Sequence, residues 1–216
     1  MEPTARDEGL DLSEVQLDAL KEICNIGMGH AATALNQMIG RAIHLTVPEA
    51  SIVPLHEIPG MIAGPDEIVA GIYLKIWGDI QGNLLFIFPQ QSTLALCTLL
   101  TGLPPDKDLI LSEMHASALR EIGNILASSF LTALTQLLGK TLIPSIPGVA
   151  FDLAGAIVDS ILMQLGEEMD LSLVVKATFS DQECGIHGHL YLLPDQASLR
   201  AILAAAKALY DPNRKR

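Results

Sequence analysis

The chain has 216 residues, of which 50% are hydrophobic but only 4% are aromatic. This length is enough to bury a sizeable core, and the composition predicts that aliphatic side chains fill it. Acidic residues outnumber basic ones by 25 to 13, which gives a net charge of −12. That charge disfavours nucleic acid and anionic membrane surfaces as partners.

The two ends of the chain are rich in polar and charged residues. Residues 1–11 are acidic and polar, unlike a secretory signal, and we expect them and the tail at 210–216 to be flexible. No run of about 18 uninterrupted apolar residues occurs, so we expect no membrane insertion. The cysteines are three in number and widely spaced, which favours a reducing cytoplasm over a disulfide framework.

In the first half of the chain, the pattern predicts a long helix, three strands and a shorter helix. Apolar residues recur every three or four positions up to 39, with Ser13 as the expected N-cap and Gly40 as the stop. The expected strands are 42–47, 68–77 and 83–88, and the shorter helix is 90–100. The segment 102–108, with two prolines and two aspartates, marks the seam, that is, the connection between the two halves of the chain.

In the second half, the pattern again predicts a long helix, followed by an extra short helix, two strands and a last helix. Ser112 begins a long helix that ends at Gly139. The expected later elements are a short extra helix within 152–165, strands at 171–179 and 188–193, and a last helix at 197–209.

One four-residue pattern occurs in both halves, ninety-nine positions apart. The first copy is Asp18, Glu22, Asn25 and Pro48, and the second copy is Ser117, Glu121, Asn124 and Pro147. Twenty-two residues separate Asn from Pro in each copy, and the surrounding Glu-Ile-x-Asn-Ile and Thr-Ala-Leu-x-Gln segments also repeat. We therefore expect one domain over 12–209, built from two repeats at about 12–102 and 111–209.

The polar residues of each copy share one helix face. At about 100° per residue, Asn25 lies about 20° from Asp18, and Glu22 lies about 40° away on the other side. A mid-helix Asn does not favour the helix, so its repetition indicates a function. An amide is no base near neutral pH, but it can orient a water molecule. Phosphoryl transfer depends mainly on positioning and charge neutralisation, so Glu and Asn could suffice for dephosphorylation.

The repeated motif resembles that of the CheC/CheX/FliY phosphatases of bacterial and archaeal chemotaxis. It consists of Asp or Ser, then Glu after three residues, Asn after two more, and Pro after a further twenty-two. Two copies on a chain of this length resemble the CheC branch, and nothing resembles the additional flagellar-switch domain of FliY. The resemblance covers about 12–209. It implies an α/β (α+β) fold in which two long helices, related by a pseudo-twofold axis, pack on a largely antiparallel sheet.

The resemblance also implies an activity, the hydrolysis of the aspartyl phosphate on a phosphorylated CheY-type response regulator. Asn25 and Asn124 would orient the attacking water, and Glu22 and Glu121 would pair with a receiver lysine. Mg²⁺ would be supplied by the receiver, with no cofactor bound by this chain itself. The remaining motif residues would support docking (Asp18 and Ser117) and shape the loop beside each helix (Pro48 and Pro147).

A second partner is implied for the short helix in the longer repeat. This helix resembles the docking site for CheD, the receptor deamidase, where an acidic residue takes part, and Asp159 would be that residue. An exposed helix face explains Asp159 equally well.

Two other functions are compatible with parts of the sequence. The chain could be a non-catalytic receiver-binding or flagellar-switch adaptor that uses the same helices, but the complete Glu and Asn pairs favour a phosphatase. It could also be a metal hydrolase that uses Cys184, His187 and His189. In a strand the two histidines share a face and the cysteine has the opposite parity, so we expect no metal site. His30 and His115 are weaker catalytic candidates.

Overall fold

The structure is a computed structural model that describes residues 14–40, 44–54, 57, 64, 66–103, 112–165, 171–181 and 186–209. Several predicted features lie outside the described residues: the terminal segments 1–11 and 210–216, the N-cap Ser13, the thiol of Cys184 and most of the seam at 102–108.

The first half of the chain contains α1 (Glu14–Ile39), β1 (His44–Pro54), β2 (Ile68–Gly78), β3 (Gly82–Pro89) and α3 (Gln90–Thr101). The second half contains α4 (Glu113–Leu138), β4 (Leu142–Pro144), β5 (Gly148–Leu153), α5 (Ala154–Leu165), β6 (Leu171–Asp181), β7 (Ile186–Pro194) and α6 (Gln196–Leu209). The predicted helices and strands lie where the sequence places them, except that the strand predicted at 42–47 continues as β1 to Pro54. Strands β4 and β5 were not predicted.

Both long helices end as their sequences predict. Gly40 and Gly139 follow them with φ of 71° and 62°, a left-handed conformation that glycine adopts at little cost. At the start of α4, the hydroxyl of Ser112 accepts a hydrogen bond from the backbone N–H of His115, as a capping box requires.

The strands form one antiparallel sheet to which both halves contribute. Its order is β1-β6-β7-β3-β2-β4, and β5 also pairs with β2. The last strand of each half lies at the centre, and the first strands are exchanged: β1 pairs with β6, while β4 and β5 pair with β2. The expected fold, two long helices on an antiparallel sheet, is confirmed.

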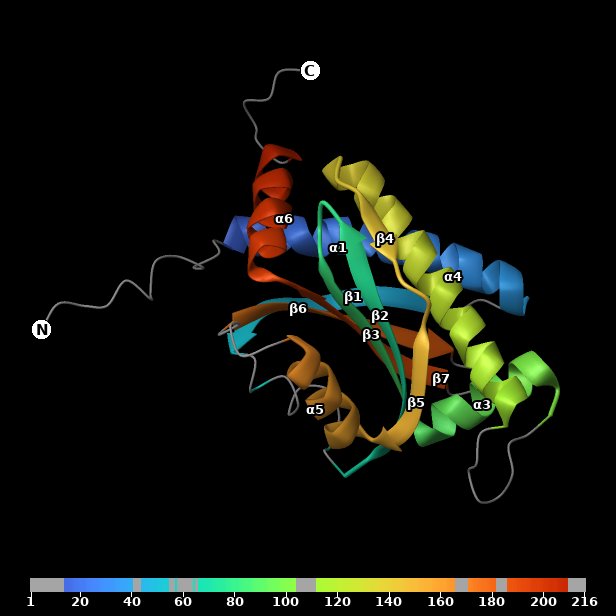
Figure 1. Ribbon diagram of the computed structural model, residues 1–216. Coiled ribbons are helices and arrows are strands. Elements are labelled where there is room, and N and C mark those ends of the chain that lie inside the picture. Colours follow the sequence, from blue (N-terminus) through green and yellow to red (C-terminus); the bar gives the residue numbers. More distant parts are fainter. Residues whose placement is uncertain are drawn as a thin grey trace, which may run out of the picture.

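Helices cover the sheet unequally on its two faces. In Figure 1, α1, α4 and α6 lie on one side of the sheet and α5 lies on the other. The larger core, on the α1 and α4 side, includes Met28 and Phe130, both of which are fully buried. The smaller core includes Ile157 and Ile161 of α5. Full burial of one such side chain contributes about 1.5–3 kcal/mol, so both cores stabilise the sheet.

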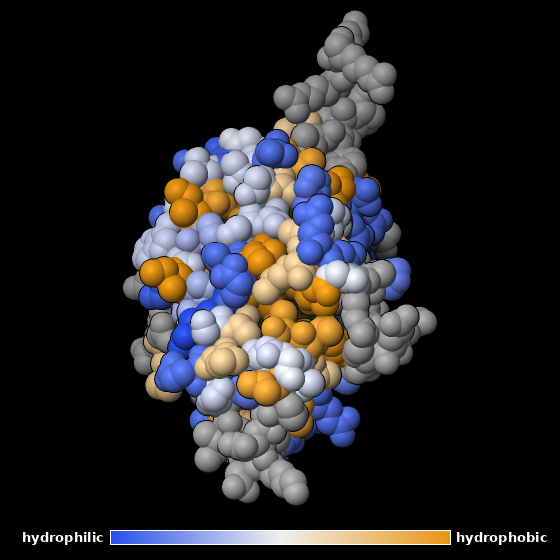
Figure 2. Space-filling model, turned by 90° about the vertical axis from the view of Figure 1, so that its right-hand side faces the viewer, coloured by the Kyte–Doolittle hydropathy of each residue, from blue (hydrophilic) through white to orange (hydrophobic). Residues whose placement is uncertain are grey.

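The central strands read as continuous apolar runs because they are buried on both faces. Along β3, Leu84 and Phe86 point into the larger core, whereas Leu85 and Ile87 point into the smaller one. In the view of Figure 2, polar and apolar residues are mixed on the surface, with an apolar group near the centre. None of the helices in the described part of the chain is long and apolar enough to cross a bilayer.

Candidate functional site

The first motif lies on the outer face of α1, as its spacing predicts. Asp18, Glu22 and Asn25 are all exposed. The neighbouring Ile23 and Cys24 point the other way and are each 2% exposed. A carboxylate and an amide are thus held on a helix whose opposite face is fixed in the core.

The second motif lies in the same way on α4. Ser117, Glu121 and Asn124 are exposed. They line a shallow depression of about 330 Å³, whose opposite wall is the connection between β4 and β5. The lining residues are Ser117, Arg120, Glu121, Asn124, Pro144, Ser145, Ile146 and Pro147. Sequence reasoning missed Arg120, although a basic residue precedes the motif Glu in both copies.

Pro147 lies close to the helix beside Asn124. A Cβ atom at Gly123 would lie 3.6 Å from Cβ of Pro147 and 2.5 Å from Cγ2 of Ile72 on β2. Only a glycine allows α4 to approach the sheet this closely. The wall is anchored to β2 because the N–H of Ser145 donates to the carbonyl of Lys75 at 2.8 Å, and the N–H of Lys75 donates to Oγ of Ser145 at 2.9 Å.

Pro48 does not lie in a loop, and that expectation was wrong. It is part of β1, which continues to Pro54, and the register with β6 shifts between Thr46 and Glu49. Proline has no N–H to donate to a neighbouring strand, so it occurs on edge strands and at bulges. β1 is an edge strand of the sheet with such an irregularity at Pro48.

The two motif helices pack against each other through a small residue. A Cβ atom at Gly27 would lie 2.8 Å from Cδ2 of Phe130 on α4, so this glycine serves helix packing. Gly29, by contrast, is exposed and has no atom within 4 Å of its Cβ position. Further along, a shallow groove is lined by His30 of α1 together with Ser128, Ser129 and Thr132 of α4. The outer faces of the two helices therefore adjoin.

The thiol next to the first motif is no candidate nucleophile. Cys24 lies between Glu22 and Asn25 in the sequence but points into the core. Burial raises its pKa to about 12, so the reactive thiolate is not formed near neutral pH.

Three of the described histidines have structural partners. His115 is 5% exposed, caps α4 with Ser112, and lies with Nε2 3.3 Å from the carbonyl oxygen of Leu103. His187 donates its backbone N–H to Oγ of Ser92, and the His189 ring packs edge-on against Tyr191. Within the described ranges, no group of three or more His, Cys, Asp or Glu side chains could hold a metal ion.

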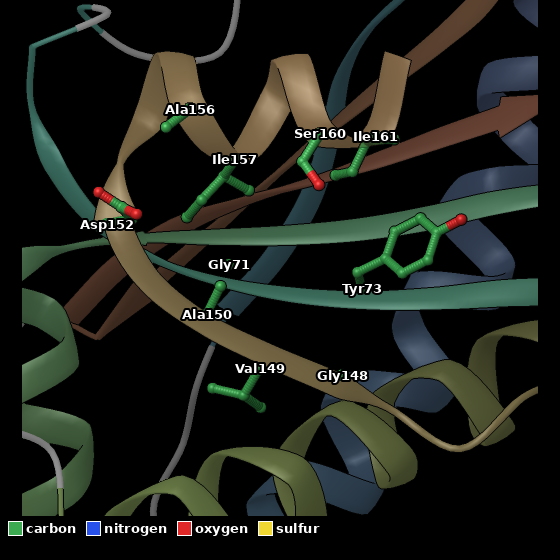
Figure 3. Close-up of a pocket in the computed structure, with 10 residues that line it drawn as sticks. All are labelled: Gly71, Tyr73, Gly148, Val149, Ala150, Asp152, Ala156, Ile157, Ser160 and Ile161. Carbon is green, nitrogen blue, oxygen red and sulfur yellow. The ribbon is translucent and has the colours of Figure 1, made fainter. Parts of the chain in front are cut away.

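Asp159 is exposed on α5, remote from both motifs in the fold. The opposite face of α5 packs into the smaller core, on the sheet face away from α1 and α4. Beside it lies a depression of about 290 Å³ between α5, β2 and β5. Figure 3 shows Ser160 and Ile157 pointing from α5 toward this depression and Tyr73 facing it from β2.

The sequence and the structure both match known proteins. A family model described as the CheC-like family matches residues 15–52 and 114–150, the segments that carry the two motifs. CheY-P phosphatase CheC of Bacillus subtilis (strain 168) is 37% identical over 201 residues, which are 91% of this chain and 96% of that protein.

Two solved structures share the fold at lower identity. FliY of Thermotoga maritima has a TM-score of 0.73 at 21% identity and covers 93% of this chain and 100% of its own. A complex of CheX with CheY, BeF3 and Mg²⁺ from Borrelia burgdorferi matches with a TM-score of 0.51 at 17% identity. The match covers 78% of this chain and 94% of the matched chain. These two structures show the shared fold. The family follows from the family model and from the 37% identity to the B. subtilis protein over 91% of this chain: the chain belongs to the CheC-like family.

Proposed function

We propose that this chain is a phosphatase that hydrolyses the aspartyl phosphate of a CheY-type response regulator in chemotaxis signalling, with two sites per chain. The observation that carries the proposal is the duplicated Glu-x-x-Asn motif, exposed on both long helices. The B. subtilis relative, which is named a CheY-P phosphatase, supports the same activity.

At each site the amide orients the attacking water. Asn25 and Asn124 each carry a donor N–H₂ and an acceptor oxygen, which can hold one water molecule in line with the phosphorus. The water oxygen forms a bond to phosphorus as the bond to the aspartyl oxygen breaks. The products are inorganic phosphate and the receiver's free aspartate carboxylate, and the water's proton leaves with the phosphate or solvent.

The motif carboxylates and the receiver supply the charges. Glu22 and Glu121 pair with a receiver lysine near the phosphoryl group, which holds the two proteins in register. Mg²⁺ belongs to the receiver, and the presence of Mg²⁺ with CheY in the CheX complex supports this assignment. Asp18 and Ser117 extend the docking face. Because the proposed substrate is a cytoplasmic regulator, the proposed reaction takes place in the cytoplasm.

The outer surface of α5 is proposed as the docking site of a CheD-type deamidase. Asp159 is exposed there, and Met163 is 78% exposed. Because α5 and the motif helices lie on opposite faces of the sheet, this partner and the receiver can bind at the same time (Figure 1).

The test is to mix the purified chain with a CheY-type receiver phosphorylated by acetyl phosphate, remove the phosphodonor, and follow phosphate release. Faster release with the chain than without it supports the proposal. If the chain binds the BeF3-activated receiver but leaves the rate of phosphate release unchanged, it is an adaptor and not a phosphatase.

A further inference from the structure

The two sites differ in charge at the residue that precedes the motif Glu. This residue is Lys21 in α1 and Arg120 in α4. In the first site, Nζ of Lys21 lies 3.8 Å from Oδ1 of Asp18, an ion pair between residues one helical turn apart. The cation of the first site is therefore already engaged by a motif carboxylate.

In the second site that carboxylate is missing. Ser117 occupies the position of Asp18, so Arg120 has no acidic partner three residues before it. Arg120 is exposed and lines the depression that also contains Glu121 and Asn124. Asp18, Lys21 and Glu22 give the first site two negative charges and one positive, whereas the equivalent Ser117, Arg120 and Glu121 give the second site one of each.

The position of Arg120 on the helix brings it near the reacting group. Residues four apart are neighbours on a helix surface, so Arg120 lies one turn before Asn124 on the same side. A guanidinium has a planar fork of donors that matches phosphoryl oxygens. A phosphorylated partner is anionic and approaches a chain with a net charge of −12, so a cation at the docking point offsets repulsion there.

We propose that Arg120 is a phosphoryl-binding residue of the second site, and that this site engages the phosphorylated receiver more strongly than the first. The inference rests on the proposed phosphatase function. It adds a contact beyond the Asn and Glu pair and makes the two copies unequal, although their motifs are both complete.

The experiment isolates each site before testing its cation. Asn25→Ala leaves only the second site and Asn124→Ala leaves only the first, and phosphate release from the receiver is measured over a range of receiver concentrations. In the second-site-only chain, Arg120→Ala should lower kcat/KM by about tenfold, because hydrogen bonds to charged groups are strong. Arg120→Lys should recover part of the loss, since it keeps the charge without the fork. The matched control, Lys21→Ala in the first-site-only chain, should change kcat/KM by less than about twofold, because that cation is paired.

A second variant tests the pairing itself. Ser117→Asp in the second-site-only chain recreates the ion pair of the first site, so it should lower kcat/KM and weaken its dependence on salt. In a chain that already carries Arg120→Ala, Ser117→Asp should cause little further loss of kcat/KM. A purely steric effect of the aspartate would lower kcat/KM in both backgrounds.

The outcomes separate this inference from the function on which it rests. If the second-site-only chain is active and Arg120→Ala keeps its kcat/KM, Arg120 is only a solvated surface residue and the inference is wrong. An equal effect of Lys21→Ala at the first site would also overturn it. If the unmodified chain releases no phosphate at all, the phosphatase function itself fails.

Discussion

Replacing Gly123 by alanine tests how closely α4 approaches the sheet beside the second site. The new Cβ would lie 2.5 Å from Cγ2 of Ile72, against about 3.4–4 Å for ordinary contact, so the helix or Ile72 must move by about 1 Å. Such overpacking costs about 1–3 kcal/mol. Alanine is also the better helix former by about 1 kcal/mol, so the net change should lie between about zero and 2 kcal/mol of destabilisation.

Gly29→Ala is the matched control. It is also a mid-helix glycine, but its Cβ would meet no atom within 4 Å, so it should gain the full helix-propensity benefit of about 1 kcal/mol. For a domain of this size, 1 kcal/mol shifts Tm by about 2–4 °C. In thermal unfolding followed by circular dichroism, Gly123→Ala should therefore melt about 2–12 °C below Gly29→Ala. Equal Tm values would refute the close packing of α4 on β2.

Three further predictions concern other parts of the chain. Asp159→Lys should weaken binding of a CheD-type deamidase in a pull-down while leaving phosphate release by the chain alone unchanged; loss of phosphate release with the fold intact would contradict the separation of the two surfaces. Burial raises the pKa of Cys24 to about 12 and that of Cys97 to about 11, so iodoacetamide at pH 8 should label both only after unfolding; mass spectrometry showing rapid labelling of the native protein would argue against the buried positions. Elemental analysis of the purified chain should find no stoichiometric transition metal, and a tightly bound zinc or iron would count against a metal supplied by the receiver.

Local sequence signals predicted most elements of this fold because each signal acts within a few residues. The periodicity of α1 and α4, and the glycines that end them, required no knowledge of the rest of the chain. The exposed faces that carry Asn25 and Asn124 followed from the same periodicity. Which other segments lie beside these helix faces depends on contacts between residues that are distant in the sequence.

The parts that escaped prediction are those that tertiary pairing decides. Pro48 was expected to end its strand, but an edge position and a bulge accommodate it within β1. β5 was missed because it is short and none of its residues is fully buried, so its sequence carries no clear alternation. Its pairing with β2 holds it in the sheet. The exchange of first strands between the halves, and the close approach of Pro147 to α4 at Gly123, likewise depend on residues that only the folded chain brings together.

The most direct test of the central claim is the rate of phosphate release from a phosphorylated CheY-type receiver with Asn25 and Asn124 replaced by alanine, singly and together. Each single variant should retain the activity of its intact site, and the double variant should lose on the order of a hundredfold or more, because a water-positioning group acts only in the reaction. Alanine improves helix propensity at both exposed positions, so unfolding would not explain the loss. A double variant that releases phosphate at the normal rate would show that these amides do not orient the water.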